Sequence, residues 1–166
     1  MATRKLILLR HGKSDWHSAA AADFERPLNG RGRRNAVQVG RWLHFYSIHP
    51  DVICCSSSMR TRQTLALVST ELNIADAEVN FIGDLYHATE SEVIRIADEQ
   101  LAHHQTVMLL GHNPGFELAL MHYCPDVEVP ADGKLMTTAC VAVIALTPGE
   151  AAKLEHLKRP DEAFDL

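Results

Sequence analysis

Three short apolar runs in this chain each stop abruptly at a polar motif. Residues 5–9 lead into Arg10-His11-Gly12, residues 51–56 lead into a serine-rich stretch, and residues 106–111 lead into His112. A short apolar run with polar boundaries is typical of a strand buried on both faces, as in a parallel sheet. Segments with helical periodicity separate the runs, so we predict an α/β fold, a mostly parallel sheet with helices on both faces.

The helices expected between these strands have recognisable start signals. Asn29 is placed to cap a helix that extends to about Tyr46, and Ser57 or Ser58 can cap a second. Thr89 precedes a third helix, and Asn113 with Pro114 at the first helical position predicts a fourth. Residues 78–81 form a weak strand and residues 138–146 a last core strand. The 166 residues fit one domain, with a peripheral tail expected from about residue 150.

Composition excludes several classes of protein. A formal net charge of -5 argues against a nucleic-acid-binding surface, because binding to a phosphate backbone needs a basic face. No apolar run approaches the roughly 20 residues that span a bilayer, and the first residues lead straight into a strand, so we expect a cytoplasmic protein that binds no membrane. The four cysteines show no metal-ligand spacing and are expected to be buried free thiols.

The predicted strand ends bring cations together. Parallel strands end at the same edge of a sheet, where open α/β sheets bind their ligands. Arg10 and His11 follow the first strand, Arg60 lies in the first turn of the helix after the second, and His112 follows the third. Two guanidinium groups and two imidazoles without a matching acidic cluster suit a bound phosphoryl dianion. A histidine fixed beside such a phosphate can attack it.

Other chemistries lack their motifs. The ten histidines include no His-x-x-x-His or His-Glu-x-x-His arrangement, so a zinc site is not expected. The chain has neither a Gly-x-Ser-x-Gly elbow nor a Gly-x-x-x-x-Gly-Lys-[Ser/Thr] loop. The stretch from Gly30 to Asn35 imitates a dinucleotide fingerprint but lacks the third glycine and follows no strand. We therefore expect neither a metal nor a cofactor.

Three motifs together resemble a known family. They are Leu9-Arg10-His11-Gly12, the stretch Ser56-Ser57-Ser58-Met59-Arg60-Thr61-Arg62-Gln63-Thr64, and Gly111-His112-Asn113-Pro114-Gly115. In this order and spacing they look like the histidine phosphatase superfamily, the phosphoglycerate-mutase-like group. The small size, Arg26-Pro27-Leu28 and Met136-Thr137-Thr138-Ala139 resemble its SixA-type branch, the bacterial phosphohistidine phosphatases. The resemblance implies a three-layer α/β/α sandwich, phosphoglycerate mutase-like.

The resemblance also implies roles for individual residues. His11 would be the nucleophile that carries the phosphoryl group transiently, and Arg10, Arg60 and His112 would surround its oxygens. Members that cleave phosphate esters often place a glutamate near residues 83–89, where this chain offers Asp84 as a possible general acid, with Glu90 just beyond. The missing glutamate fits a phosphoramidate substrate, because an imidazole leaving group needs a proton far less than an alkoxide does.

Several alternatives stay open at this level. The leading hypothesis is a phosphatase that acts on phosphohistidine in a partner protein, and the second is a small-molecule phosphomonoesterase of the same superfamily. A non-catalytic phosphate-binding or interaction domain is a third. The basic residues Lys13, Arg26 and Arg62 could form a rim that recruits an acidic partner. The sequence does not reveal the oligomeric state.

Overall fold

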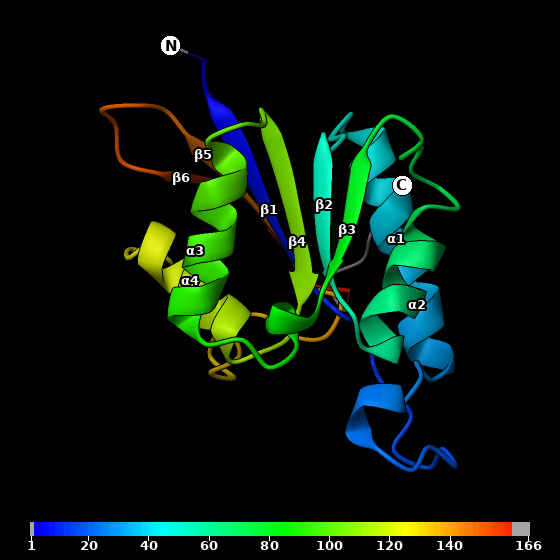
Figure 1. The fold of residues 1–166 in the computed structure, drawn as a ribbon. Coiled ribbons are helices and arrows are strands. Elements are labelled where there is room, and N and C mark those ends of the chain that lie inside the picture. Colours follow the sequence, from blue (N-terminus) through cyan, green and yellow to red (C-terminus); the bar gives the residue numbers. More distant parts are fainter. Residues whose placement is uncertain (1, 161–166) are drawn as a thin grey trace.

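The computed structural model describes residues 2–160, which form one six-stranded sheet between two layers of helices (Figure 1). The strands are β1 (Arg4–Arg10), β2 (Val52–Ser56), β3 (Glu78–Ile82), β4 (Thr106–Gly111), β5 (Val141–Leu146) and β6 (Lys153–Lys158). Their order across the sheet is β3-β2-β4-β1-β5-β6. The predicted α/β/α sandwich with a mostly parallel sheet is confirmed.

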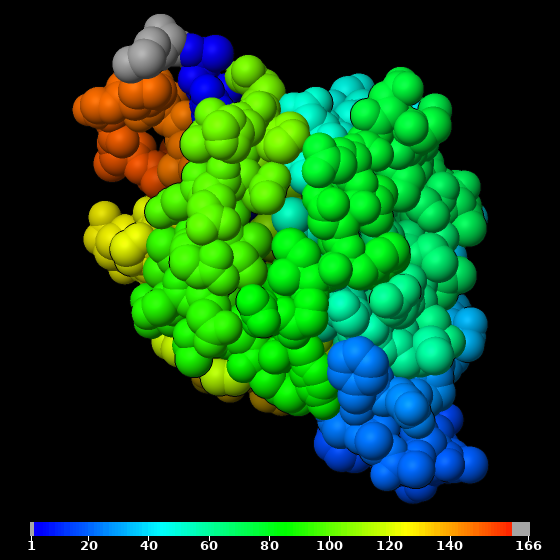
Figure 2. All heavy atoms as spheres, viewed as in Figure 1, coloured from blue at the N-terminus to red at the C-terminus, as the bar shows by residue number. Residues whose placement is uncertain are grey.

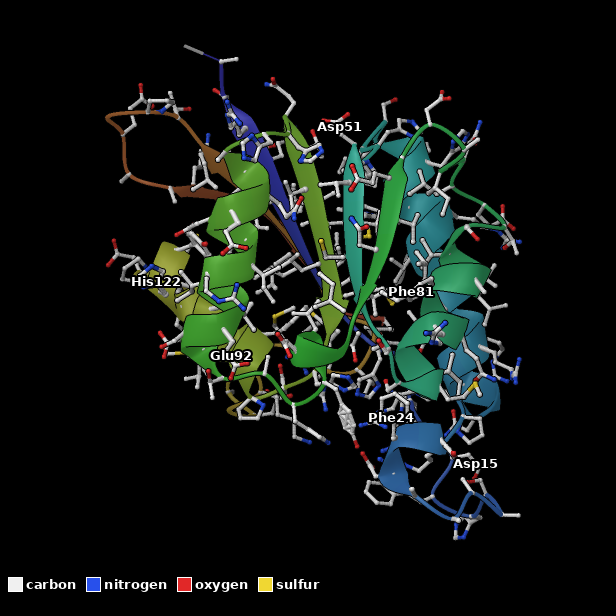
Figure 3. All side chains as sticks on the ribbon, viewed as in Figure 1. Asp15, Phe24, Asp51, Phe81, Glu92 and His122 are labelled. Atoms are coloured by element: carbon white, nitrogen blue, oxygen red, sulfur yellow. The ribbon has the colours of Figure 1, made fainter. Side chains whose placement is uncertain are left out.

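The direction of each strand determines which of its ends lies at the edge of the sheet where ligands are expected to bind. Strands β1, β2, β3 and β4 are parallel, so all four end at the edge opposite Asp51, which is labelled in Figure 3. Strand β5 pairs antiparallel with β1, so its first residue, Val141, lies at that edge. Strand β6 is antiparallel to β5, and its last residues return there. Six segments thus contribute side chains to one edge.

Helices cover both faces because the strands are apolar on both. Helices α1 (Gly30–Phe45) and α2 (Met59–Val68) pack on one face, and α3 (Glu90–Leu101) and α4 (Gly115–Tyr123) pack on the other (Figure 1). Successive residues of β1 enter opposite layers: Leu6 and Leu8 join the core beneath α3 and α4, and Ile7 and Leu9 join the core beneath α1 and α2. All four are fully buried. The alternation follows from the period of two along a strand.

Most predicted helix starts agree with the structure. The Asn29 side chain accepts a hydrogen bond from the Gly32 amide, and Thr89 forms a capping box with Glu92. Helix α4 begins at Gly115, one residue later than predicted, after a cis Asn113–Pro114 bond. The Asn113 side chain still accepts a hydrogen bond from the Glu117 amide at 3.3 Å, so it caps the helix from outside.

The C-terminal part of the chain differs most from the sequence expectation. The last core strand begins at Val141 instead of residue 138, because Cys140 donates to the carbonyl of Thr137 in a turn and Ala139 donates to the carbonyl of His11. Residues 153–158, in the tail expected to be peripheral, form β6 at the edge of the sheet. Within residues 2–160 no helix is long and apolar enough to cross a membrane. All four cysteines are buried and free.

A close contact between glycines fixes the turn after β1. A side-chain carbon on Gly12 would lie 2.7 Å from the carbonyl oxygen of Gly32, and one on Gly32 would lie 2.2 Å from the carbonyl oxygen of Lys13. The first turn of α1 is therefore packed directly against the backbone that follows His11. Any larger residue at either glycine would displace that backbone.

Candidate active site

The ends of β1 and β4 place two histidines next to each other. The His11 amide donates to the Gly111 carbonyl at 3.1 Å, and the rings of His11 and His112 are 5.1 Å apart between centroids. Both residues are buried, with 6% and 3% of their surface exposed. The predicted proximity of the two imidazoles follows from the parallel pairing of β1 with β4, which puts Arg10 opposite Gly111.

His11 is held as a neutral imidazole with one bare nitrogen. Its Nδ1 lies 2.7 Å from the carbonyl oxygen of Gly12, which can only accept, so Nδ1 carries the proton. Burial holds the pKa of His11 well below its usual range, and the nearby charges of His112, Arg60 and Arg10 act in the same direction. The hydrogen bond to Gly12 opposes this shift but does not cancel it. A neutral ring with its proton on Nδ1 has a free lone pair on Nε2.

His112 is oriented by the serines that follow β2. Its Nε2 lies 2.8 Å from the Ser56 hydroxyl oxygen, which also accepts from the Ser58 amide at 3.4 Å. The Ser56 hydroxyl has its own hydrogen to donate to Nε2, and in that tautomer the His112 proton is on Nδ1. Burial, with the charge of Arg60, lowers the pKa of His112 to about 3. His112 can thus offer one N–H donor while remaining uncharged.

The two arginines are anchored through part of each guanidinium. Arg10 donates from Nη1 to the Met136 carbonyl at 3.0 Å. Arg60, only 2% exposed, donates from Nη1 to the backbone carbonyl of Asp23 at 2.9 Å and from Nη2 to its carboxylate at 3.1 Å. Thr64 connects the turn after β1 to helix α2, since its hydroxyl accepts from the Gly12 amide and donates to the Arg60 carbonyl.

These groups surround a cavity of about 180 Å³, here called the phosphoryl pocket. It is lined by Arg10, His11, Lys13, Ser14, Trp16, Arg26, Arg60, His87, His112, Asn113 and Thr138. Among the residues described, several nitrogens on this lining are buried and lack a hydrogen-bond partner: Nε of Arg10, Arg26 and Arg60, Nη1 of Arg26, and Nδ1 of His112. Buried polar atoms without a partner are costly, and the cationic side chains of this lining suit an anion.

The loop that contains Arg26, one of the expected rim residues, flanks the site. Residues 17–28 contain the short helix η1 (Asp23–Glu25) and project from the body, as the blue protrusion in Figure 2 shows. Phe24, labelled in Figure 3, stacks on Tyr86 with ring centroids 4.9 Å apart. Arg26 lies over the Trp16 ring, 3.5 Å from its centroid. Aromatic and cation–π contacts thus hold this loop against the pocket.

Asp23 is the carboxylate of the site. It accepts hydrogen bonds from Arg60, from Arg26 at 2.7 Å, from the Tyr86 hydroxyl, and from His87 at 3.2 Å. Partial burial alone would raise the pKa of Asp23, but the Tyr86 hydrogen bond and the charge of Arg60 outweigh it and hold that pKa well below the usual range. Asp23 is therefore ionised at neutral pH and has no proton to donate.

The structure brings together Arg10, His11, Arg60 and His112, which the sequence analysis grouped as catalytic and phosphate-binding residues. Of the expected rim, Lys13 and Arg26 line the phosphoryl pocket. Arg62 instead donates to the Ser57 carbonyl and lies over the Phe81 ring, beside a different depression. Asp84, the suggested general acid, is exposed on η2 (Gly83–Leu85) and is not part of the lining.

Sequence reasoning gave no role to Asp23, Tyr86 or His87. The available signal for Asp23 was its spacing of three residues from Arg26, an i, i+3 pair of opposite charges. Within the residues from 2 to 160, no group of three or more His, Cys, Asp or Glu side chains could hold a metal ion. The site can bind a tetrahedral anion and present the bare Nε2 of His11 to it.

Comparisons with known proteins agree with this geometry. Residues 6–85 match the model of the histidine phosphatase superfamily (branch 1). An uncharacterized chloroplastic protein of Arabidopsis thaliana is 33% identical over 98% of this chain and 80% of its own length. A crystal structure assigned to phosphohistidine phosphatase SixA of Agrobacterium tumefaciens superposes with a TM-score of 0.80, 25% identity, and coverage of 95% of this chain and 98% of that one.

A further structural neighbour contains an oxyanion. It is the protein histidine phosphatase SixA in complex with tungstate, with a TM-score of 0.80 and 21% identity, covering 95% of this chain and 98% of that chain. At this identity the similarity concerns the fold.

Proposed function

Because the chain belongs to branch 1 of the histidine phosphatase superfamily, we propose that it is a metal-independent phosphatase that removes the phosphoryl group from phosphohistidine in a partner protein. One observation carries the proposal: the cationic side chains of Arg10, Arg26 and Arg60 and the imidazole of His112 line the same small pocket as His11. A phosphoryl dianion is a ligand that suits such a lining.

The first chemical step transfers the phosphoryl group to His11. The lone pair on Nε2 forms a bond to phosphorus while the bond from phosphorus to the substrate nitrogen breaks, and that electron pair returns to the leaving imidazole. The hydrogen bond from Nδ1 to Gly12 fixes the ring and stabilises the positive charge that develops on it. The Arg10 and Arg60 guanidinium groups and the Nδ1–H of His112 neutralise the oxygens, which is most of the work in phosphoryl transfer.

The second step releases phosphate. Water attacks the phosphorus, the bond to His11 Nε2 breaks, and inorganic phosphate leaves with the oxygen of that water. The electron pair returns to His11, which is again neutral and ready for another turnover. Burial favours this neutral form, because the depressed pKa of His11 opposes protonation once the phosphoryl group has left.

Leaving-group chemistry favours a phosphoramidate over an alkyl ester. The carboxylate at the site, Asp23, is ionised and cannot protonate a departing alkoxide. Asp84, which could have done so, is exposed and outside the pocket lining. The imidazole of phosphohistidine can instead leave as a neutral molecule when its other nitrogen already carries a proton. The site therefore fits a P–N substrate better than an unactivated P–O substrate.

Two measurements test the proposal. In the first, the rate of phosphate release is compared for a phosphohistidine peptide, an aryl phosphate and an alkyl phosphate. We expect the peptide to be preferred and the alkyl ester to be the poorest substrate. A preference for the alkyl ester would contradict the proposed substrate and support a small-molecule phosphomonoesterase. EDTA should leave the rate unchanged, and vanadate should inhibit.

The second measurement looks for the covalent intermediate. Enzyme mixed with labelled substrate is quenched in alkaline denaturant, since a P–N bond is lost in acid, and the label is located by peptide mapping. We expect it on His11 and expect none in the His11→Asn variant. Label on another residue, or turnover by His11→Asn, would contradict the mechanism.

A further inference from the structure

A second cavity adjoins the phosphoryl pocket. Its volume is about 510 Å³, and it shares Arg10, Lys13, Asn113 and Thr138 with the smaller pocket. The shared residues make the two cavities neighbours, so a molecule whose phosphoryl group lies at His11 would extend into the larger one. We call the larger cavity the flanking groove. Its volume falls within the ~300–1,000 Å³ typical of sites for drug-sized ligands, far more than one phosphate needs.

The flanking groove is built from segments that only the sheet topology brings together. Arg31 comes from the first turn of α1, Lys134 from the loop after α4, and Arg159 directly follows β6. Because β6 is antiparallel to β5, its end returns to the edge that contains His11. A tail expected to be peripheral therefore supplies a wall of the groove.

The groove has an excess of positive charge. Five cationic side chains and two carboxylates line it, whereas the whole chain has a net charge of -5. The cations are Arg10, Lys13, Arg31, Lys134 and Arg159, and the carboxylates are Glu117 and Asp132. A local excess of one sign against the overall charge concentrates ligands of the opposite sign.

Both carboxylates hold the wall of the groove together. Glu117 accepts a hydrogen bond from the Leu135 amide at 2.7 Å. Asp132 accepts from Arg159 at 2.6 Å and from the Lys134 amide at 3.0 Å. These contacts connect α4 and the end of β6 to the loop that carries Lys134. The acids are thus engaged in shaping the groove, and the surplus charge on its lining is positive.

We propose that the flanking groove binds an acidic segment of the protein that carries the phosphohistidine, with Lys134 as a specificity-determining residue. The inference rests on the proposed function, because the groove extends from the phosphoryl pocket. Its volume exceeds that of a single anion, and its cations come from separate segments, so a stretch of chain with several carboxylates matches it. Such exposed pairs change affinity and selectivity, and they leave the chemical step unchanged.

The test compares two phosphohistidine peptides that differ in one respect. One has glutamates beside the phosphohistidine and the other has glutamines. We expect the wild-type protein to show a lower KM for the acidic peptide, with similar kcat, and the difference to shrink at high salt. Lys134→Glu should raise KM for the acidic peptide by about 30-fold, because the charge reversal removes one attraction of ~1 kcal/mol at ~4 Å in water and adds a repulsion of similar size. It should leave kcat and the KM of the glutamine peptide unchanged.

A matched variant controls for net charge. Lys153→Glu makes the same change at an exposed residue at the opposite end of β6. It should not alter the preference, whereas Lys134→Glu should. An equal KM of the wild-type protein for both peptides, or an equal effect of Lys134→Glu and Lys153→Glu, would overturn the inference.

A second readout separates this inference from the proposed function. Unphosphorylated tetraglutamate is tested as a competitive inhibitor of aryl phosphate hydrolysis, in which phosphohistidine plays no part. We expect inhibition of the wild-type protein that weakens in Lys134→Glu. If phosphohistidine peptides are not hydrolysed but this inhibition is found, the proposed substrate is wrong, and the inference that the flanking groove binds an acidic segment is supported. If tetraglutamate does not inhibit, or inhibits both proteins equally, the groove inference is wrong.

Discussion

The buried neutral histidines should make the stability of this protein depend on pH in a measurable way. In the folded chain the pKa of His112 is about 3, well below its ordinary value of 6.5. Below that ordinary value the unfolded chain takes up a proton that native His112 does not. Acid therefore favours the unfolded state, and the contribution of His112 is fully present above about pH 6.5 and declines as the pH falls toward 3.

The magnitude follows from the shift. One pKa unit corresponds to about 1.4 kcal/mol, and pH 5 lies about 1.5 units below the unfolded pKa, so His112 alone should cost about 2 kcal/mol between pH 7 and pH 5. His11 acts in the same direction. Asp23, whose pKa is also lowered, affects stability only below its ordinary value of 3.8 and so does not contribute in this range.

Urea unfolding at the two pH values measures this effect. With a slope of about 2 kcal/mol per molar urea, the His112 contribution lowers the midpoint by about 1 M. We expect His112→Asn to lose that part of the pH dependence, while His103→Asn, at an exposed position after α3, retains it. Parallel losses of stability in wild-type protein and His112→Asn would refute a buried, neutral His112.

Four other outcomes follow from the same coordinates. Arg60→Ala should lower kcat by about 10²- to 10³-fold, the usual effect of removing a group that stabilises developing charge, as steady-state kinetics can test. Asp23→Asn removes a negative charge that is paired with Arg60. The inhibition constant of inorganic phosphate for this variant should therefore fall by about tenfold. An increase would contradict the claim that the charge of Asp23 weakens anion binding. Asp84→Asn should change kcat less than twofold, since its carboxylate is outside the pocket lining. Leu8→Ala, at a fully buried position, should cost about 2–5 kcal/mol in urea unfolding without abolishing phosphate binding.

The position of Asp23 suggests how the site is held before substrate binds. Its carboxylate connects Arg60 and Arg26 to Tyr86 and His87, so the loop around η1, the α2 start and the η2 loop meet on one side chain. A phosphoryl dianion would approach the same guanidinium groups. Asp23 thus orients these cations. Its negative charge weakens the binding of an anion, and the Asp23→Asn measurement would show by how much.

Local signals in the sequence were sufficient for the first five strands, for the four α-helices and for the residues that end the buried strands, but not for β6. Apolar runs of five or six residues predict buried strands wherever they occur, and Asn29 and Thr89 cap helices through bonds to residues three positions away. Because parallel strands end at one edge, the sequence predicts that Arg10, His11, Arg60 and His112 lie at that edge, and the observed order β2-β4-β1 makes their strand ends neighbours. These inferences need only contacts within a few residues and a rule of topology.

The tertiary structure alone decided which polar groups meet across the site and what encloses them. Asp23 bonds to Arg60, 37 residues away, and to Tyr86, 63 residues away. No periodicity in the sequence indicates contacts at such separations. The same holds for Arg159, which reaches the groove because β6 pairs with β5 and brings the chain back to the edge near His11. Burial, and with it the depressed pKa of both histidines, also depends on how distant segments exclude water from the pocket. Hydrogen bonds and desolvation act between neighbours in space, so these features exist only once the sheet has assembled.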